Sequence, residues 1–258
     1  KQAQVAPQSK LVRSLDEAQA IYEGRPGASR YPHVFDPIEI RGNVYKNRLI
    51  AAPTMFFHAV YFIPQITENI YRMVGVRAEG GFGCVSTGEI PANFEESRGA
   101  FMDRAIDIHH YYGSDFDKAK EYADRIHAGG ALAYFEFSHE GLEADDADQP
   151  WGPEDMVRED GRHVFGMDRQ MMEKVCRDFF DLGRFAVAAG FDGVLLHGGH
   201  GFLIQQFVSP ATNHRTDEFG GSIENRSRFP KMLLQALRAG VGEDKVIELR
   251  MSAEDGEP

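Results

Sequence analysis

The fold is decided by residues 131–137, Ala-Leu-Ala-Tyr-Phe-Glu-Phe, and by the long segment after them. This apolar run has the length of a buried strand. About 30 residues, 138–167, separate it from a helical pattern that begins at Asp168 and ends at Gly190. A second apolar run, 191–196, comes immediately afterwards. The connection into this second strand is therefore short, whereas the connection out of the first is far longer than the usual loop of ~4–6 residues.

The same alternation of strands and helices extends along most of the chain. We predict five strands, at residues 49–52, 82–87, 131–137, 191–196 and 245–251. Four helices are predicted between them, beginning near Thr67, Ser114, Asp168 and Ser222. Strands that alternate with helices in this way are parallel and are joined by right-handed crossovers. The pattern alone fits either an open, doubly wound sheet or a barrel.

The long connections favour the barrel, because a (β/α)8 TIM barrel carries its long loops at the carboxyl ends of the strands. We therefore expect an α/β fold, a TIM barrel of which this chain contains about the first five strands in sequential order. Residues 33–258 form this partial barrel and open with a hairpin at 34–44, while residues 1–32 form a polar N-terminal extension with one helix at 15–22. Because an open piece would expose two edges, we expect the remaining strands on missing sequence or on another chain.

Charge and composition argue against several classes of partner. The formal net charge of −12 disfavours binding to nucleic acid and to anionic lipid. No apolar run approaches the ~20 residues of a membrane-spanning helix. Cys84 and Cys176 fall in a predicted strand and a predicted helix, so we expect no disulfide framework and a cytoplasmic location. We expect a small-molecule substrate and a possible homo-oligomer.

Two histidines mark the end of the fourth predicted strand, in the sequence His197-Gly198-Gly199-His200. Imidazoles three residues apart can point at one carbonyl oxygen or small anion, and the glycines let backbone approach a ligand. Two loop histidines with structural hydrogen bonds are the plain alternative. A metal site lacks an obvious third ligand at close spacing, so we expect none.

Two further charged residues interrupt apolar strands. Glu136 lies in the third strand and Arg250 in the fifth, where a buried charge requires a partner. Either residue could face an anionic or hydrogen-bonding ligand at the strand ends. An internal ion pair between them is nearly as plausible.

Residues 197–229 resemble the old yellow enzyme family. They read His-Gly-Gly-His-Gly-Phe-Leu-Ile-Gln-Gln-Phe-Val-Ser-Pro-Ala-Thr-Asn-His-Arg-Thr-Asp-Glu-Phe-Gly-Gly-Ser-Ile-Glu-Asn-Arg-Ser-Arg-Phe. The run is most similar to the branch of 2,4-dienoyl-CoA reductase, trimethylamine dehydrogenase and the bile-acid and enoate reductases. Residues 35–38, 46–50 and 52–53 match the family's opening hairpin and first strand. The resemblance implies a (β/α)8 barrel that binds FMN at the carboxyl ends of its strands.

The resemblance also implies roles for individual residues. His197 and His200 match the catalytic pair that grips the substrate's activating oxygen. The remaining matches are to flavin-binding positions: Pro53, Thr54 and Met55 along the flavin, Gly88 and Glu89 at its ring, Glu136 at its pyrimidine edge and Arg250 near N1. A fixed guanidinium there stabilises the negative charge of reduced flavin.

Three features depart from the family pattern. The proton-donating tyrosine two residues after the second histidine is replaced by Phe202, and Pro230 interrupts the fourth predicted helix. The family's phosphate site comes from loops after strands seven and eight, which have no counterpart among these residues. Larger members of the branch carry an iron–sulfur cluster and FAD, which we expect only in sequence beyond this chain.

The resemblance implies an FMN-dependent oxidoreductase that uses NADH or NADPH. Hydride would pass between the nicotinamide and an unsaturated, carbonyl-activated small molecule. An amine dehydrogenase or demethylase on the same scaffold is the first alternative, since Phe202 cannot donate a proton. A non-catalytic flavin-binding or interaction module is the second.

Overall fold

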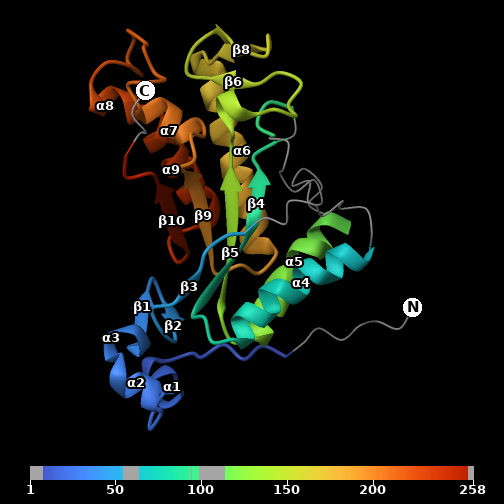
Figure 1. The fold of residues 1–258 in the computed structure, drawn as a ribbon, viewed down its shortest axis with the longest axis vertical. Helices are drawn as coiled ribbons and strands as arrows, with labels where there is room; N and C mark the ends of the chain where they lie inside the picture. The colour runs from blue at the N-terminus through green and yellow to red at the C-terminus, as the bar shows by residue number, and fades with distance from the viewer. Residues whose placement is uncertain (1–7, 55–63, 94, 99–113, 255–258) are drawn as a thin grey trace.

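The computed structural model of the chain describes residues 8–54, 64–93, 95–98 and 114–254. Its centre is a curled parallel sheet that forms half of a barrel (Figure 1). The strands are β3 (Ile50–Ala51), β4 (Cys84–Pro91), β5 (Leu132–Ser138), β9 (Gly193–Gly198) and β10 (Val246–Met251). They are all parallel and lie side by side in chain order, which confirms the predicted sequential order.

Four long helices cover the outer face of this sheet. They are α4 (Pro64–Glu79), α5 (Ser114–Ala128), α6 (Arg169–Ala188) and α9 (Arg228–Val241). Their apolar sides share one core with alternate strand residues, among them Phe135, Phe137 and Leu196. Asp168 caps α6 as predicted, because its side chain accepts a hydrogen bond of 2.8 Å from the backbone of Met171. Side chains alternate along each strand, so the strand residues between these core positions face the inner side of the half-barrel.

The inner side is closed at the amino ends of the strands by the predicted hairpin. This hairpin pairs β1 (Ile38–Ile40) with β2 (Asn43–Tyr45) in antiparallel register. The Tyr45 hydroxyl contacts the Tyr134 hydroxyl of β5. A small apolar cluster surrounds this contact and contains Cys84, Leu132 and Val246. The inner side is thus apolar at the amino ends, which leaves its polar residues for the opposite edge.

The fourth predicted helix is two helices in the structure. Ser222 caps the short α8 (Ile223–Arg226), and a new helix, α9, begins at Arg228. Pro230 lies in the first turn of α9, where its missing N–H has no helical partner to lose. The predicted helix is therefore interrupted, as expected from Pro230, but the break lies before the proline, at Ser227.

Several short elements were not predicted. The long connection after β5 contains the 3₁₀ turn η1 (Gly141–Glu143) and the strands β6 (Trp151–Gly152), β7 (Met156–Val157) and β8 (His163–Gly166). The segment after β9 forms α7 (Leu203–Val208). The N-terminal segment forms α1 (Leu15–Ala20), α2 (Pro26–Arg30) and α3 (Pro32–Phe35), of which only the first was expected. Figure 1 shows β6, β8 and α7 beyond the carboxyl ends of the strands, and α1 to α3 beyond the amino ends.

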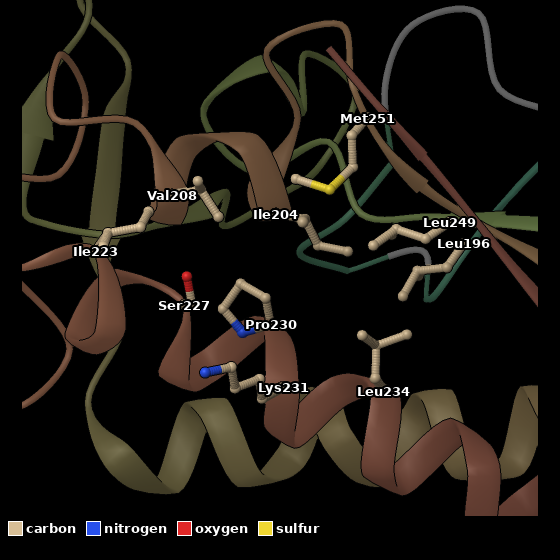
Figure 2. A pocket seen from close by; sticks show the side chains of 10 residues that line it. All are labelled: Leu196, Ile204, Val208, Ile223, Ser227, Pro230, Lys231, Leu234, Leu249 and Met251. Carbon is tan, nitrogen blue, oxygen red and sulfur yellow. The ribbon is translucent and has the colours of Figure 1, made fainter. Parts of the chain in front are cut away.

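An apolar cavity of about 280 Å³ lies on the outer face of β9 and β10, beside α7, α8 and α9 (Figure 2). Its wall consists of Leu196, Ile204, Val208, Ile223, Ser227, Pro230, Lys231, Leu234, Leu249 and Met251. Leu249 and Met251 are 37% and 51% exposed. In a (β/α)8 barrel the ring of helices covers the outer side of each strand, and the active site lies at the carboxyl ends of the strands. This cavity is therefore not at the active-site position. No helix within the described ranges is long and apolar enough to cross a membrane.

Candidate active site

The strands end at one edge of the sheet, which we call the carboxyl edge. The predicted residues His197, Glu136 and Arg250 all lie on inner-side positions at or near this edge, and His200 lies just beyond it. Arg250 pairs with His197 in the register of β10 and β9. The parallel sheet therefore brings together residues that are 114 positions apart in sequence, from Glu136 to Arg250.

The two histidines contact each other directly. His197 is 2% exposed, and its Nε2 lies 3.0 Å from His200 Nδ1. The backbone N–H of Gly199 donates to His197 Nδ1 at 3.2 Å. At the other end of the pair, Arg250 Nη2 lies 3.1 Å from His200 Nε2. His200 holds this position with a φ of 56°, a left-handed conformation that is strained for a residue with a side chain.

These three contacts cannot all be hydrogen bonds at once. A neutral imidazole has one donor nitrogen and one acceptor nitrogen. If His197 accepts from Gly199, it donates from Nε2 to His200, which must then carry its own proton on Nε2. That proton meets the guanidinium of Arg250, which has donors only. An acceptor oxygen placed between His200 and Arg250 would resolve the conflict, because it could accept from both.

Both histidines are held in the neutral form. Burial lowers the pKa of His197 to about 3, with further lowering by His200 and Arg250. Burial and the charge of Arg250 also lower the pKa of His200. The pair therefore acts as a set of neutral hydrogen-bond donors near pH 7.

Glu136 and Arg250 form an ion pair beside the histidines, with 3.7 Å between Glu136 Oε1 and Arg250 Nη1. This distance is too long for a hydrogen bond, and Oε1 is buried without one within the described part of the chain. Burial and the neighbouring Glu89 raise the pKa of Glu136 to about 9, although Arg250 lowers it. Glu136 thus offers an unsatisfied polar group to the inner side of the sheet.

Glu89 lies opposite Glu136 in the register of β4 and β5, just after an irregularity between Ser86 and Glu89. Burial raises the pKa of Glu89 to about 7, while nearby Ser138 and Arg250 lower it. Both Glu89 Oε1 and Ser138 Oγ are buried and lack a hydrogen bond among the residues that the structure describes. The carboxyl edge therefore carries three unsatisfied polar groups, from Glu89, Glu136 and Ser138.

The other predicted positions lie near the same edge. Pro53 and Thr54 follow β3, and Arg77 of α4 donates to Thr54 Oγ1 at 3.1 Å. Gly88 lies in β4, where its carbonyl accepts a hydrogen bond of 2.9 Å from the Thr87 hydroxyl. No contact joins Pro53 or Thr54 to the histidine pair among the described residues. Met55 lies outside the residues that the structure describes.

Sequence reasoning overlooked the residues that come directly after β5. Glu140 is 8% exposed, and its backbone N–H donates to Ser97 O at 3.1 Å. The side chain of Gln206 donates both to Glu140 O, at 2.9 Å, and to Gly201 O, at 2.5 Å. Glu140 is thus fixed beside the loop that carries His200. The one sequence signal for a buried carboxyl at this position is the run Ser-His-Glu-Gly, which places two ionisable residues at a strand end.

Phe202 completes the surroundings of the histidine pair. Its ring centroid lies 4.8 Å from that of His197 and 6.0 Å from that of His200. The residue precedes α7 as its N-cap position. An aromatic ring at this place excludes water from one side of His197 and supplies no proton.

Comparison with known proteins agrees with this arrangement. Residues 33–257 match the model of the NADH:flavin oxidoreductase / NADH oxidase family. An NADH oxidase of Thermoanaerobacter brockii is 28% identical over 232 residues, which are 88% of this chain and 35% of that protein. Histamine dehydrogenase from Rhizobium sp. 4-9 is 28% identical with a TM-score of 0.76, over 86% of this chain and 34% of that one.

A second similar structure is a 2-naphthoyl-CoA reductase. It is 25% identical with a TM-score of 0.73, over 85% of this chain and 35% of its own. The chain thus spans about a third of the length of each of these three relatives. Its matched region includes the histidine pair and every strand of the sheet. The chain therefore belongs to the NADH:flavin oxidoreductase / NADH oxidase family, whose solved members are TIM barrels of the old yellow enzyme type.

Proposed function

We propose that this chain is the FMN-binding part of an oxidoreductase that uses NADH or NADPH and acts on an unsaturated, carbonyl-activated small molecule. The family match and the similarity to an NADH oxidase support the use of a flavin and of a nicotinamide co-substrate. The similar 2-naphthoyl-CoA reductase supports reduction as the direction of the reaction.

The observation that carries this proposal is the surplus of donors at the histidine pair. His200 Nε2 and Arg250 Nη2 lie 3.1 Å apart, and both carry protons when His197 accepts from Gly199. A carbonyl oxygen placed near the two would accept a hydrogen bond from each. Neutral donors aimed at such an oxygen stabilise the negative charge that develops there when hydride adds to a conjugated double bond.

The unsatisfied groups of the carboxyl edge fit a flavin ring. The pyrimidine edge of a flavin presents an N–H donor between two carbonyl acceptors, and Glu136 with Arg250 offers a matching acceptor and donor. We propose that these two hold that edge, and that Pro53, Thr54, Met55, Gly88 and Glu89 lie along the ring. Bound FMN would supply hydride transfer, the chemistry that this set of side chains lacks.

The protein's own residues would then bind and orient the substrate. His200 Nε2 and Arg250 donate to its activating oxygen, His197 keeps the His200 proton on Nε2 by donating to His200 Nδ1, and Phe202 excludes water beside the pair. Arg250 already faces His200 Nε2 at 3.1 Å, so it would reorganise little when charge develops. The two free cysteines, Cys84 and Cys176, are consistent with a reducing, cytoplasmic location.

The test is a flavin titration followed by anaerobic reduction. In the complete protein, we expect FMN fluorescence to be quenched on binding, and NADH or NADPH to bleach the bound flavin. When 2-cyclohexen-1-one is added, cyclohexanone should form and the colour of the oxidised flavin should return. If the complete protein neither quenches nor reduces FMN, it is a module without this activity.

A second candidate is the oxidation of an amine, and Phe202 is the observation that favours it. Reduction of an activated double bond needs a proton as well as a hydride, whereas oxidation needs no acid at this position. The similarity to histamine dehydrogenase points in the same direction. Bleaching of the flavin by an amine, without nicotinamide, would distinguish this candidate from the first.

A further inference from the structure

The loop that carries His200 has an arrangement that is unfavourable by itself. His200 has a φ of 56° and Gly201 a φ of 77°, so two successive residues are left-handed. In addition, His200 Nε2 lies 3.1 Å from Arg250 Nη2, although both nitrogens carry protons in the neutral pair. A strained residue and two facing donors persist only where the surrounding structure holds them in place.

The side-chain oxygen of Gln205 joins the two sides of this contact. Gln205 lies in α7, and its Oε1 accepts a hydrogen bond of 2.8 Å from the N–H of Gly201, the residue directly after His200. The same oxygen accepts a hydrogen bond of 2.9 Å from Ser252 Oγ, two residues after Arg250. One acceptor thus connects the histidine loop with the end of β10.

The end of β10 packs closely against the histidine loop. A Cβ at Gly198 would lie 3.0 Å from Arg250 O, and a Cβ at Gly199 would lie 3.3 Å from Ser252 Oγ. Glycine at both positions permits this approach. The ladder between β9 and β10 ends at Gly198, and beyond it the oxygen of Gln205 joins the two segments.

Gln206 holds the other backbone group of Gly201. Its Nε2 donates to Gly201 O at 2.5 Å and to Glu140 O at 2.9 Å. Its own carbonyl accepts a hydrogen bond of 2.8 Å from Thr212 Oγ1, which fixes the far end of α7. Two consecutive glutamines therefore bind the N–H and the carbonyl of the residue that follows His200.

We propose that Gln205 is a positioning residue, whose oxygen keeps His200 in its left-handed conformation and within reach of the same substrate oxygen as Arg250. This inference rests on the proposed function, because it names a further residue of the same site. Gln205 acts through the two donors and not on the substrate itself. Donors that are held in place before the substrate binds do not have to reorganise when negative charge develops on its oxygen.

The test measures how the complete, FMN-saturated protein recognises a negatively charged oxygen. Pentafluorophenolate and pentafluorobenzene are the probes, because they differ in that oxygen, and calorimetry at pH 8 gives the affinity for each. We expect native protein to bind the phenolate more tightly by about tenfold or more. Gln205→Met keeps the length of the side chain and removes the acceptor. It should lose about tenfold in affinity for the phenolate, as when one hydrogen bond to a charged group is lost, and bind pentafluorobenzene unchanged.

Ser252→Ala is the second variant, because Ser252 is exposed and the change should leave the fold intact. It should weaken phenolate binding by about threefold in the native background and add no loss to Gln205→Met, since the two residues form one link. Thr212→Val is the matched control. It removes a hydrogen bond to the backbone of α7 at the far end from His200, and should change the phenolate affinity by less than about twofold.

Quenching of FMN fluorescence is recorded first in each sample. Absent quenching, or a native protein without preference for the phenolate, contradicts the proposed function and this inference with it. A preference that survives in Gln205→Met overturns this inference alone, and so do additive losses in the double variant. If Gln205→Met does not fold, Ser252→Ala decides: a loss confined to the phenolate supports the inference, and an unchanged affinity overturns it.

Discussion

Arg250 Nη2 faces His200 Nε2 at 3.1 Å, and the backbone N–H of Gly199 faces His197 Nδ1 at the opposite end of the pair. The backbone N–H and the guanidinium thus enclose two neutral imidazoles, which leaves two donors, His200 Nε2–H and Arg250 Nη2–H, without an acceptor. We propose that an oxygen atom of the substrate accepts from both.

Burial of Glu136 gives the protein a pH dependence, which Arg250 reduces. Glu136 has a pKa of about 9 when folded and an ordinary pKa of 4.5. Between these values the folded state holds a proton that the unfolded state has released, so stability falls as pH rises through this window. We expect Glu136→Gln to gain stability relative to the native protein from pH 5 to pH 8, by up to ~1.4 kcal/mol per pH unit. Urea denaturation at several pH values measures the free energy of unfolding of both proteins. Parallel pH profiles of the native protein and Glu136→Gln would contradict the prediction.

Gly141 should be intolerant of any side chain. Its φ is 64°, and an added Cβ would collide with Gln206 Oε1. We expect Gly141→Ala to destabilise the protein by ~2 kcal/mol or more, from backbone strain together with the collision. Gly161→Ala is the control, because Gly161 has a φ of 84° and nothing within 4 Å of such a Cβ. Urea denaturation should show a clearly smaller loss in the control, and equal losses would mean that contact with Gln206 is unimportant.

The phosphate of FMN should contribute little to binding by this 258-residue chain. In the family that the sequence resembles, the phosphate is held by loops after strands seven and eight, and the described sheet ends at its fifth strand. A phosphate normally gains charge-assisted hydrogen bonds at such loops. We therefore expect weak binding, with riboflavin and FMN of equal affinity within about threefold by fluorescence titration. Tight, stoichiometric binding of FMN, with a strong preference over riboflavin, would refute this prediction.

The replacement of a tyrosine by Phe202 should limit the supply of protons. Phe202 packs 4.8 Å from the His197 ring, so a hydroxyl added to it would lie close to the reacting substrate. We expect Phe202→Tyr to speed alkene reduction by ~10-fold or more, short of the ~10²–10⁴-fold of an ideally placed acid. Flavin reduction by nicotinamide should stay nearly constant. Stopped-flow measurement of flavin reduction by nicotinamide and of flavin oxidation by the alkene tests this prediction, with Phe202→Leu as the control for packing. Unchanged rates in Phe202→Tyr would make residue 202 a packing residue only.

The sequence predicted the sheet because its buried strands are continuous apolar runs with glycines or polar residues before them. It also placed His197, Glu136 and Arg250 at one edge, since parallel strands end together. It could not predict Glu140, because burial of that carboxyl depends on Gln206, which is 66 positions away. The helix break was expected from Pro230, although not its place at Ser227. The short strands after β5 were missed because their stability comes from tertiary packing and not from local periodicity.

The central claim is that the histidine pair holds the substrate's activating oxygen. It is tested most directly by single-turnover oxidation of the reduced flavin by 2-cyclohexen-1-one in the native protein, His197→Ala and His200→Ala. Loss of a donor to a developing oxyanion costs ~10²–10³-fold in other enzymes. We predict a slowing of that order in His200→Ala, which loses the donor, and in His197→Ala, which loses the group that keeps the His200 proton on Nε2, with flavin reduction by nicotinamide changed less than about threefold. Native rates of flavin oxidation in both variants would contradict the account.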